Sequence, residues 1–226
     1  MRAIIQNEIG GPEVLLMGTS EEPIPAINEV RIRVRATALN RADLLQRRGL
    51  YPPPEGASPL IGLEVAGEIE SVGAGVTQFA VGDRVCALLP GGGYAELACI
   101  DAGLVMTIPE NMPFAEAVAI PEAFITAYQA LVLLAEIEKG ETVLIHAGAS
   151  GVGLAAIQLA KEKGARVFAT ASSTKLEICR QVGAADAFDY KAGDFLEPLM
   201  QATDNQGVDV VIDLVGAPYL GSNLSA

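Results

Sequence analysis

A small-residue turn between an apolar run and a helical pattern is the part of this sequence best suited to chemistry. Residues 143–147 predict a buried strand, and residues 154–163 predict a helix. The turn between them holds Ser150, Gly151, Val152 and Gly153. Strand, glycine turn and helix together aim free backbone N–H groups and a helix dipole at a phosphate, so the segment predicts a nucleotide site. A tight turn that binds nothing is the alternative.

The next predicted strand, residues 165–171, ends without an acidic residue. Many dinucleotide folds carry an acid here that accepts hydrogen bonds from the ribose 2′-OH. This chain continues instead with Ser172, Ser173 and, two residues on, Lys175. Hydroxyls that donate and an ammonium that offsets charge suit a 2′-phosphate, so we predict NADPH as the cofactor. Helix capping by a serine and a solvated lysine would explain the same residues.

The two halves of the chain differ in their strand patterns. The second half alternates apolar strands, the last at 207–216, with helices, and so predicts βαβ units and a parallel Rossmann sheet. The first half alternates polar and apolar residues over 29–36 and 62–73, which predicts a small β-barrel or sandwich. We therefore predict an α/β protein with a β-rich domain at 1–121 and a cofactor domain at 122–226.

Composition narrows the class of protein. The chain has 226 residues, 50% of them hydrophobic, and a formal net charge of −13. That charge argues against a nucleic-acid partner, since phosphate binding needs clustered cations, and Arg31, Arg33 and Arg35 are interpreted as a solvated strand face. The apolar stretches are broken short of the ~20 residues needed to cross a bilayer, so no membrane association is expected. Three cysteines without metal spacing favour a reduced, cytoplasmic setting.

Several motifs, in order, resemble one family. They are Ala38-Leu-Asn-Arg-Ala-Asp-Leu44, Gly49-Leu-Tyr-Pro-Pro-Pro-Glu-Gly56, Gly62-Leu-Glu-Val-Ala-Gly67, Leu89-Pro-Gly-Gly-Gly-Tyr94, Ala119-Ile-Pro-Glu-Ala123 and His146 to Gly153. The chain is similar to zinc-independent quinone oxidoreductases of the medium-chain dehydrogenase/reductase superfamily, above all the p53-inducible type. The resemblance implies a GroES-like β-barrel substrate domain, a Rossmann cofactor domain, NADPH, and one- or two-electron reduction of small-molecule quinones.

The resemblance also assigns roles to single residues. Asn40 and Tyr51 are expected beside the nicotinamide and the quinone, where Asn40 could hydrogen-bond a quinone oxygen and Tyr51 could stack or donate its hydroxyl. Thr126, Tyr190 and Gly216 are expected to contact the cofactor, with Tyr190 beside the 2′-phosphate. Other roles fit some of these residues: a helix N-cap for Asn40, a surface ring packed on prolines for Tyr51, and an intrahelical hydrogen bond for Thr126.

The chain departs from its zinc-dependent relatives at two ligand positions. Asn40 stands where they carry a cysteine, and Leu63 stands where they carry a histidine. A catalytic zinc needs about three protein ligands, and the only histidine, His146, is expected to be packed or hydrogen-bonded at the end of its strand. No metal is therefore expected in the reaction.

Members of the resembling family continue beyond the position of Ala226 and pair as homodimers. For these 226 residues alone we expect an incomplete Rossmann sheet with an unfinished edge at Val208–Val215, weak NADPH binding, slow quinone reduction and self-association. Two further functions stay open: an NADPH-binding protein without turnover, and an interaction fragment whose exposed edge seeks a partner.

Overall fold

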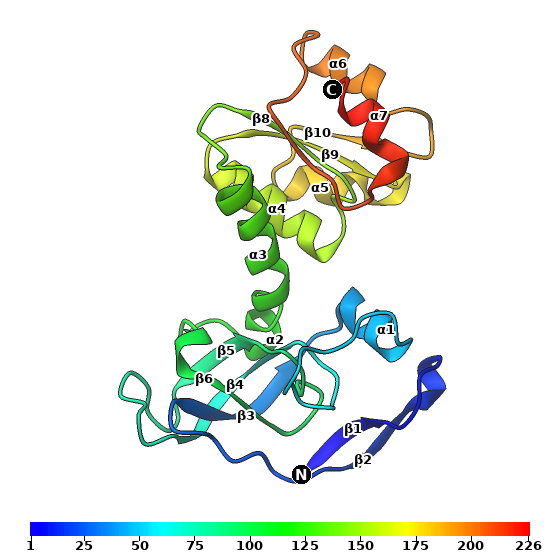
Figure 1. The fold of residues 1–226 in the computed structure, drawn as a ribbon. Coiled ribbons are helices and arrows are strands. Elements are labelled where there is room, and N and C mark those ends of the chain that lie inside the picture. Colours follow the sequence, from blue (N-terminus) through cyan, green and yellow to red (C-terminus); the bar gives the residue numbers. More distant parts are fainter. The chain divides into compact units, whose positions relative to one another are not determined.

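The computed structural model describes residues 1–226 and divides them into two compact units, Met1–Glu122 and Ala123–Ala226 (Figure 1). The first unit is built on an antiparallel sheet and the second on a parallel sheet. The predicted α/β class, with a β-rich domain followed by a Rossmann-type domain, is thereby confirmed.

The first unit is organised around a five-stranded sheet in the order β6-β3-β4-β5-β7. Its strands are β3 (Glu29–Thr37), β4 (Glu64–Val72), β5 (Arg84–Leu88), β6 (Leu97–Asp101) and β7 (Val105–Thr107), and all pairs are antiparallel. Alternate residues such as Val30, Ile32 and Val65 point to one side and form the core. The period-2 pattern of residues 29–36 thus identifies β3 correctly.

Shorter elements complete this unit. A hairpin of β1 (Arg2–Gln6) and β2 (Leu15–Thr19) forms its own two-stranded sheet, and α1 (Arg41–Arg47) and α2 (Phe114–Ala117) are short helices. This hairpin was not predicted from the sequence. Much of β2 is exposed, so its residues show no clear alternation of buried and exposed side chains.

The second unit is a parallel sheet in the order β10-β9-β8-β11, with helices on both faces. The strands are β8 (Thr142–Ile145), β9 (Arg166–Ala171), β10 (Asp186–Asp189) and β11 (Val210–Ile212). The helices are α3 (Pro121–Tyr128), whose first two residues belong to the first unit, α4 (Gly151–Glu162), α5 (Leu176–Val182), α6 (Leu196–Ala202) and α7 (Leu220–Asn223). Val143 and Ile145 share a core with α4 and α5, whereas Leu144 packs with residues of α6. Burial on both faces explains why these strands are continuously apolar.

The last strand is shorter than the 207–216 that we predicted. The side chain of Asp213 accepts hydrogen bonds from the N–H groups of Val215 and Gly216, each at 2.8 Å, and so bends the backbone away from the sheet. Gly216 then adopts a φ of +93°, a conformation that glycine tolerates without a steric cost.

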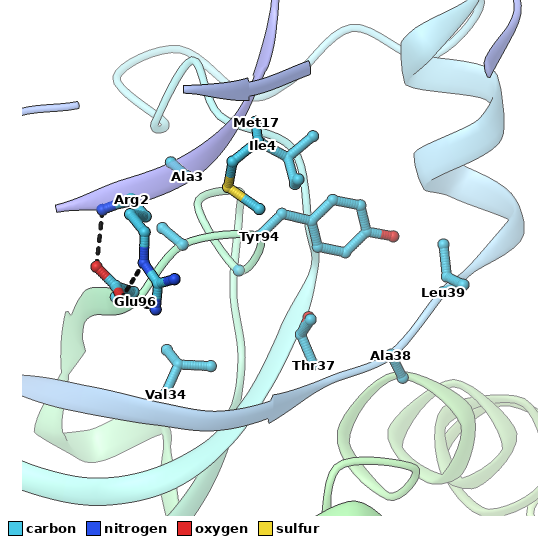
Figure 2. Close-up of a pocket in the computed structure, with 12 residues that line it drawn as sticks. Arg2, Ala3, Ile4, Met17, Val34, Thr37, Ala38, Leu39, Tyr94 and Glu96 are labelled. Carbon is cyan, nitrogen blue, oxygen red and sulfur yellow. Dashed lines mark hydrogen bonds and ion pairs between the residues drawn. The ribbon is translucent and has the colours of Figure 1, made fainter. Parts of the chain in front are cut away.

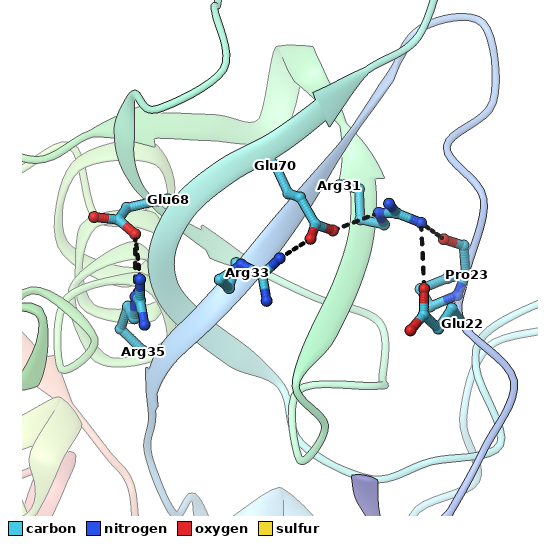
Figure 3. Close-up of polar contacts among 7 residues, drawn as sticks. All are labelled: Glu22, Pro23, Arg31, Arg33, Arg35, Glu68 and Glu70. Carbon is cyan, nitrogen blue, oxygen red and sulfur yellow. Dashed lines mark hydrogen bonds and ion pairs between the residues drawn. The ribbon is translucent and has the colours of Figure 1, made fainter. Parts of the chain in front are cut away.

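The arginines of β3 are not a simple solvated face. Arg31 and Arg33 both pair with Glu70 of β4, and Arg35 pairs with Glu68 at 2.7 Å (Figure 3). Cross-strand neighbours on one face of a sheet lie close enough for such pairs. Arg33 and Arg35 are exposed, so the prediction of a solvated strand face holds, and carboxylates on the next strand neutralise its charge.

The helical run Phe114–Leu134 is, by length and composition, sufficient to cross a membrane, contrary to the expectation that no stretch is long enough. It is interrupted, however: α2 is followed by a turn, α3 and a π-helical segment at Gln129–Leu134. Ala117 is buried in a core of the first unit, and Ala127 and Leu131 are buried in the core of the second. Core helices can have the same length and composition, and Ala117, Ala127 and Leu131 are core residues in this structure.

Candidate active site

The predicted phosphate turn joins β8 to α4. Ser150 is the N-cap of α4, and its Oγ accepts a hydrogen bond from the N–H of Gly153 at 3.0 Å. A Cβ on Gly153 would lie 2.4 Å from the carbonyl oxygen of Ala147, so only glycine fits at this close approach. Because the first N–H groups of a helix have no partner within it, Gly151 and Val152 can donate to an anion placed here.

A cleft of about 200 Å³ opens at the carboxyl edge of this sheet. It is lined by Ala147, Ala149, Ser150, Ala171, Ser172, Lys175 and Tyr190. Four of the residues that the sequence analysis assigned to the cofactor thus line one cleft, although they come from three different loops. The alanines were not predicted; they have no functional group, but their small side chains leave the space open.

The polar groups of the cleft are available to a ligand. Ser172 occupies the N-cap of a short 3₁₀ turn, Ser173–Lys175, yet its side chain makes no capping hydrogen bond. Lys175 is exposed, and 43% of Tyr190 is accessible. The alternative interpretation of Ser172 as a capping side chain is therefore not what the structure shows.

Six predicted cofactor residues do not line this cleft, and three of them, Gly151, Val152 and Gly153, belong to the first turn of α4 beside it. The other three lie elsewhere. Ser173 is exposed on the 3₁₀ turn, and Gly216 is exposed in the turn that follows β11. Thr126 is an exposed residue of α3. Their roles in cofactor binding stay predictions.

In the first unit, Asn40 is held by two carboxyl groups. It is the N-cap residue of α1, and its backbone N–H donates to Oδ2 of Asp43 at 2.7 Å. Its side-chain Nδ2 donates to Oε1 of Glu64 at 2.6 Å. The other oxygen of Glu64 accepts from the backbone N–H of Glu122 at 2.8 Å. The N-cap and the predicted substrate-side residue are thus the same asparagine, and its amide orientation is fixed by Glu64.

The acids around Asn40 are unusual in their burial. Asp43 and Glu64 are each only 2% exposed, and burial raises the pKa of both carboxyl groups. Burial also raises the pKa of Glu122, and the neighbouring Glu64 and Asp43 raise it further. The hydroxyl of Tyr94 donates to Oδ2 of Asp43 at 2.9 Å. Neither Asp43 nor Glu64 is recognisable as a functional residue from the sequence, because only the fold brings them beside Asn40.

Tyr51 and an apolar cavity of this unit are separate features. Tyr51 is 46% exposed on the loop between α1 and β4. A cavity of about 460 Å³ is bounded by Met17, Leu39 and Tyr94, with the Arg2–Glu96 ion pair at one end (Figure 2). Neither Asn40 nor Tyr51 lines this cavity.

The donor set near Asn40 does not suit a metal. Leu63, at the position of a histidine ligand in zinc-dependent relatives, is a buried apolar residue. No group of three or more His, Cys, Asp or Glu side chains in the structure is arranged to hold a metal ion. Reaction without a metal stays a prediction, and the donor set is its structural basis.

Comparison with known proteins defines the class. Residues 26–110 match the family described as alcohol dehydrogenase GroES-like domain, and residues 151–226 match the family described as zinc-binding dehydrogenase. The CurK enoyl reductase structure has a TM-score of 0.92 and 37% identity, covering 99% of this chain and 70% of that one. Escherichia coli quinone oxidoreductase complexed with NADPH has a TM-score of 0.89 and 34% identity, covering 100% and 69%.

The chain belongs to the medium-chain dehydrogenase/reductase superfamily. It is also 41% identical over 206 residues to the phenolphthiocerol synthesis polyketide synthase type I Pks15/1 of Mycobacterium bovis. That match covers 90% of this chain but 10% of the synthase, so the chain spans about a tenth of the length of this curated relative. Membership of the superfamily does not fix a substrate.

Proposed function

We propose that this protein transfers hydride from NADPH to an electron-poor C=C bond conjugated to a carbonyl, with quinones as the first substrate class. The observation that carries the proposal is the cleft beside the β8–α4 turn, where Ser150, Ser172, Lys175 and Tyr190 gather. A dinucleotide in this fold lies at the carboxyl edge of the sheet with its pyrophosphate on the helix N-terminus.

The cleft fits the 2′-phosphate better than a free ribose hydroxyl. β9 ends at Ala171, so no carboxylate is present at the strand end to accept from a 2′-OH or to repel a phosphate. Ser172 has a free hydroxyl to donate, and Lys175 supplies a positive charge. When bound, the cofactor supplies the hydride, and these residues hold it in place.

On the substrate side, Asn40 can stabilise the oxygen that gains charge. One N–H of its amide is used by Glu64, which leaves the second N–H free to donate to a carbonyl oxygen. A fixed donor costs no reorganisation as negative charge develops on that oxygen, and this is how oxyanion stabilisation accelerates a reaction. Tyr51, half-exposed on its loop, could stack on a quinone ring or donate its hydroxyl. Quinone, NADPH and a proton give hydroquinone and NADP⁺ in the two-electron case.

An enoyl thioester is the second candidate, and the comparisons favour it specifically. The polyketide synthase is 41% identical to this chain and the CurK enoyl reductase is 37% identical, compared with 34% for the E. coli quinone oxidoreductase. In enoyl reduction, hydride adds to the β-carbon and a proton to the α-carbon, so the thioester oxygen gains the charge that Asn40 would stabilise. The two candidates thus need the same donor and differ in the shape of the acceptor.

Oxidation of NADPH, followed by absorbance, tests both candidates on one protein sample. The acceptors are 1,2-naphthoquinone, 9,10-phenanthrenequinone and a crotonyl thioester of N-acetylcysteamine. Faster turnover of the quinones supports the first candidate, and faster turnover of the thioester replaces it by the second. Binding of NADPH with no turnover of any acceptor would overturn both and support a binding protein.

A further inference from the structure

The single histidine lies at a junction of the second unit. His146 directly follows β8 and is fully buried. The centroid of its ring lies 4.7 Å from that of Phe195 and 4.6 Å from that of Tyr219. Its burial and hydrogen bonding agree with the expectation that it is packed there. Nothing in the proposed reaction uses it directly.

Both ring nitrogens of His146 have side-chain partners. Nε2 lies 2.7 Å from Oδ1 of Asn223 in α7, and Nδ1 lies 2.9 Å from Oγ1 of Thr170 in β9. An amide oxygen only accepts, so Nε2 must carry the proton. Nδ1 is then an acceptor, and the Thr170 hydroxyl must donate to it. The partners therefore select one neutral tautomer.

The direction of these bonds is set by a carboxylate. Nδ2 of Asn223 donates to Oδ2 of Asp213 at 3.1 Å. Since a carboxylate only accepts, the amide of Asn223 must turn its nitrogen to Asp213 and its oxygen to His146. Oδ1 of Asp213 accepts the N–H groups of Val215 and Gly216. Thr170, His146, Asn223 and Asp213, here called the His146 network, thus form a continuous series of hydrogen bonds with one direction.

We propose that His146 is a positioning residue, and that the His146 network holds the turn 213–216 at the carboxyl edge of the sheet in the conformation that the dinucleotide requires. β11 pairs in parallel with β8, so the turn after β11 and the phosphate turn after β8 leave the same edge of the sheet. This inference rests on the proposed binding of NADPH. The network joins residues that follow β8 and β11 to β9 and α7, so loosening any member loosens the turn.

The surroundings keep the ring neutral. Burial lowers the pKa of His146, while Asn223 and the negative charge of Asp213 raise it by smaller amounts. The other groups packed against the ring are the aromatic side chains of Phe195 and Tyr219. A neutral ring is required for the network, because a protonated Nδ1 could not accept from Thr170.

Nitrogen-15 NMR reads the tautomer directly, because the chain has one histidine. We expect Nε2–H in the unmodified chain, persisting below the ordinary histidine pKa of about 6.5. Asp213→Asn should reverse the network: the new amide nitrogen donates to Oδ1 of Asn223, whose nitrogen then donates to Nε2, leaving the proton on Nδ1. Equal populations of both tautomers, or no change in Asp213→Asn, would overturn the proposal.

NADPH affinity, measured below the unfolding temperature of each variant, separates positioning from general stability. Asn223→Ala removes the link between His146 and Asp213 and should weaken NADPH binding about tenfold, the scale of one lost hydrogen bond in a buried network. Ser222→Ala is the matched control, since its hydroxyl bonds Asp194 outside the network. Lower stability of Asn223→Ala with unchanged affinity would overturn the positioning role. Failure of the unmodified chain to bind NADPH would instead overturn the proposed function, and the tautomer measurement would still decide whether the network exists.

Discussion

The side-chain nitrogen of Asn40 lies 2.6 Å from Oε1 of Glu64, and the second oxygen of Glu64 is taken by the backbone N–H of Glu122. Both oxygens of this buried carboxyl group are therefore in use, and the amide of Asn40 cannot rotate without leaving one of them unpaired. The second N–H of the Asn40 amide is therefore a donor in a fixed orientation.

Glu64→Gln should lower kcat by about tenfold, with a smaller change in KM, because glutamine has one acceptor oxygen for two donors and one hydrogen bond is lost. Glu64 acts through Asn40, so the double variant Glu64→Gln/Asn40→Ala should be no slower than Asn40→Ala alone. Steady-state kinetics of the three variants measure this coupling.

Glu68→Gln is the matched control for that experiment. It lies on the same strand, four residues further along, and pairs with Arg35 at the surface. Near-normal turnover is expected, since exposed ion pairs contribute about 0–1 kcal/mol. Additive losses in the double variant would show that Glu64 supports the fold and does not position Asn40.

Lys175→Ala tests the choice of cofactor. A charge-assisted contact to phosphate contributes about 1.5–3 kcal/mol, so the affinity for NADPH should fall roughly tenfold or more. NADH lacks the 2′-phosphate, and its affinity should change little. Titration of both cofactors by fluorescence provides the comparison; equal losses for the two would assign Lys175 to the fold.

Metal analysis tests the interpretation of Asn40 and Leu63. Elemental analysis of the purified chain should find no stoichiometric zinc, and a chelator should leave NADPH oxidation unchanged, because an amide and an alkyl group stand at two ligand positions. A zinc content near one per chain, lost together with activity on chelation, would refute the metal-free mechanism.

The elements that could be predicted from the sequence are those with local signals. A few neighbouring residues are enough to predict each of these elements. They are the β8–α4 turn with its small residues, β3 with its alternating pattern and β8 with its apolar run. Gly153 is an example, since the carbonyl oxygen of Ala147 excludes any Cβ there. Ser172 and Lys175 could be placed at the carboxyl edge of the sheet because they follow a recognisable strand, and their role in binding a phosphate stays a prediction.

The parts that could not be predicted depend on contacts between distant residues. Asn40 meets Glu64 across 24 positions, and His146 meets Asn223 across 77. No periodicity marks such pairs, because each residue sits on a different element and only the packing of the sheet brings them together. The early end of β11 has a local cause instead: the Asp213 side chain accepts from the N–H groups of Val215 and Gly216, and an apolar pattern does not mark such a turn.

The burial of Asp43 predicts how stability depends on pH. Burial raises the pKa of this carboxyl group in the folded state, although hydrogen bonds from Asn40, Tyr94 and the backbone of Gly62 oppose the shift. The folded state therefore binds the proton more tightly than the unfolded state does. It follows that the contribution of Asp43 to the free energy of unfolding is greatest below the unfolded pKa and is lost as pH rises through the folded pKa.

Asp43→Asn keeps an acceptor oxygen for the N–H of Asn40 and the hydroxyl of Tyr94, and it removes the charge. The free energy of unfolding of the unmodified chain minus that of Asp43→Asn should therefore fall as pH rises from acidic to neutral, as measured by urea unfolding at several pH values. Asp101→Asn, at an exposed carboxylate that accepts one backbone N–H, controls for the loss of a negative charge. A difference that grows with pH would mean that the hydrogen bonds outweigh burial. Asp43 would then be a charged acceptor that stabilises the start of α1, and Asn40 would be held beside a carboxylate at neutral pH.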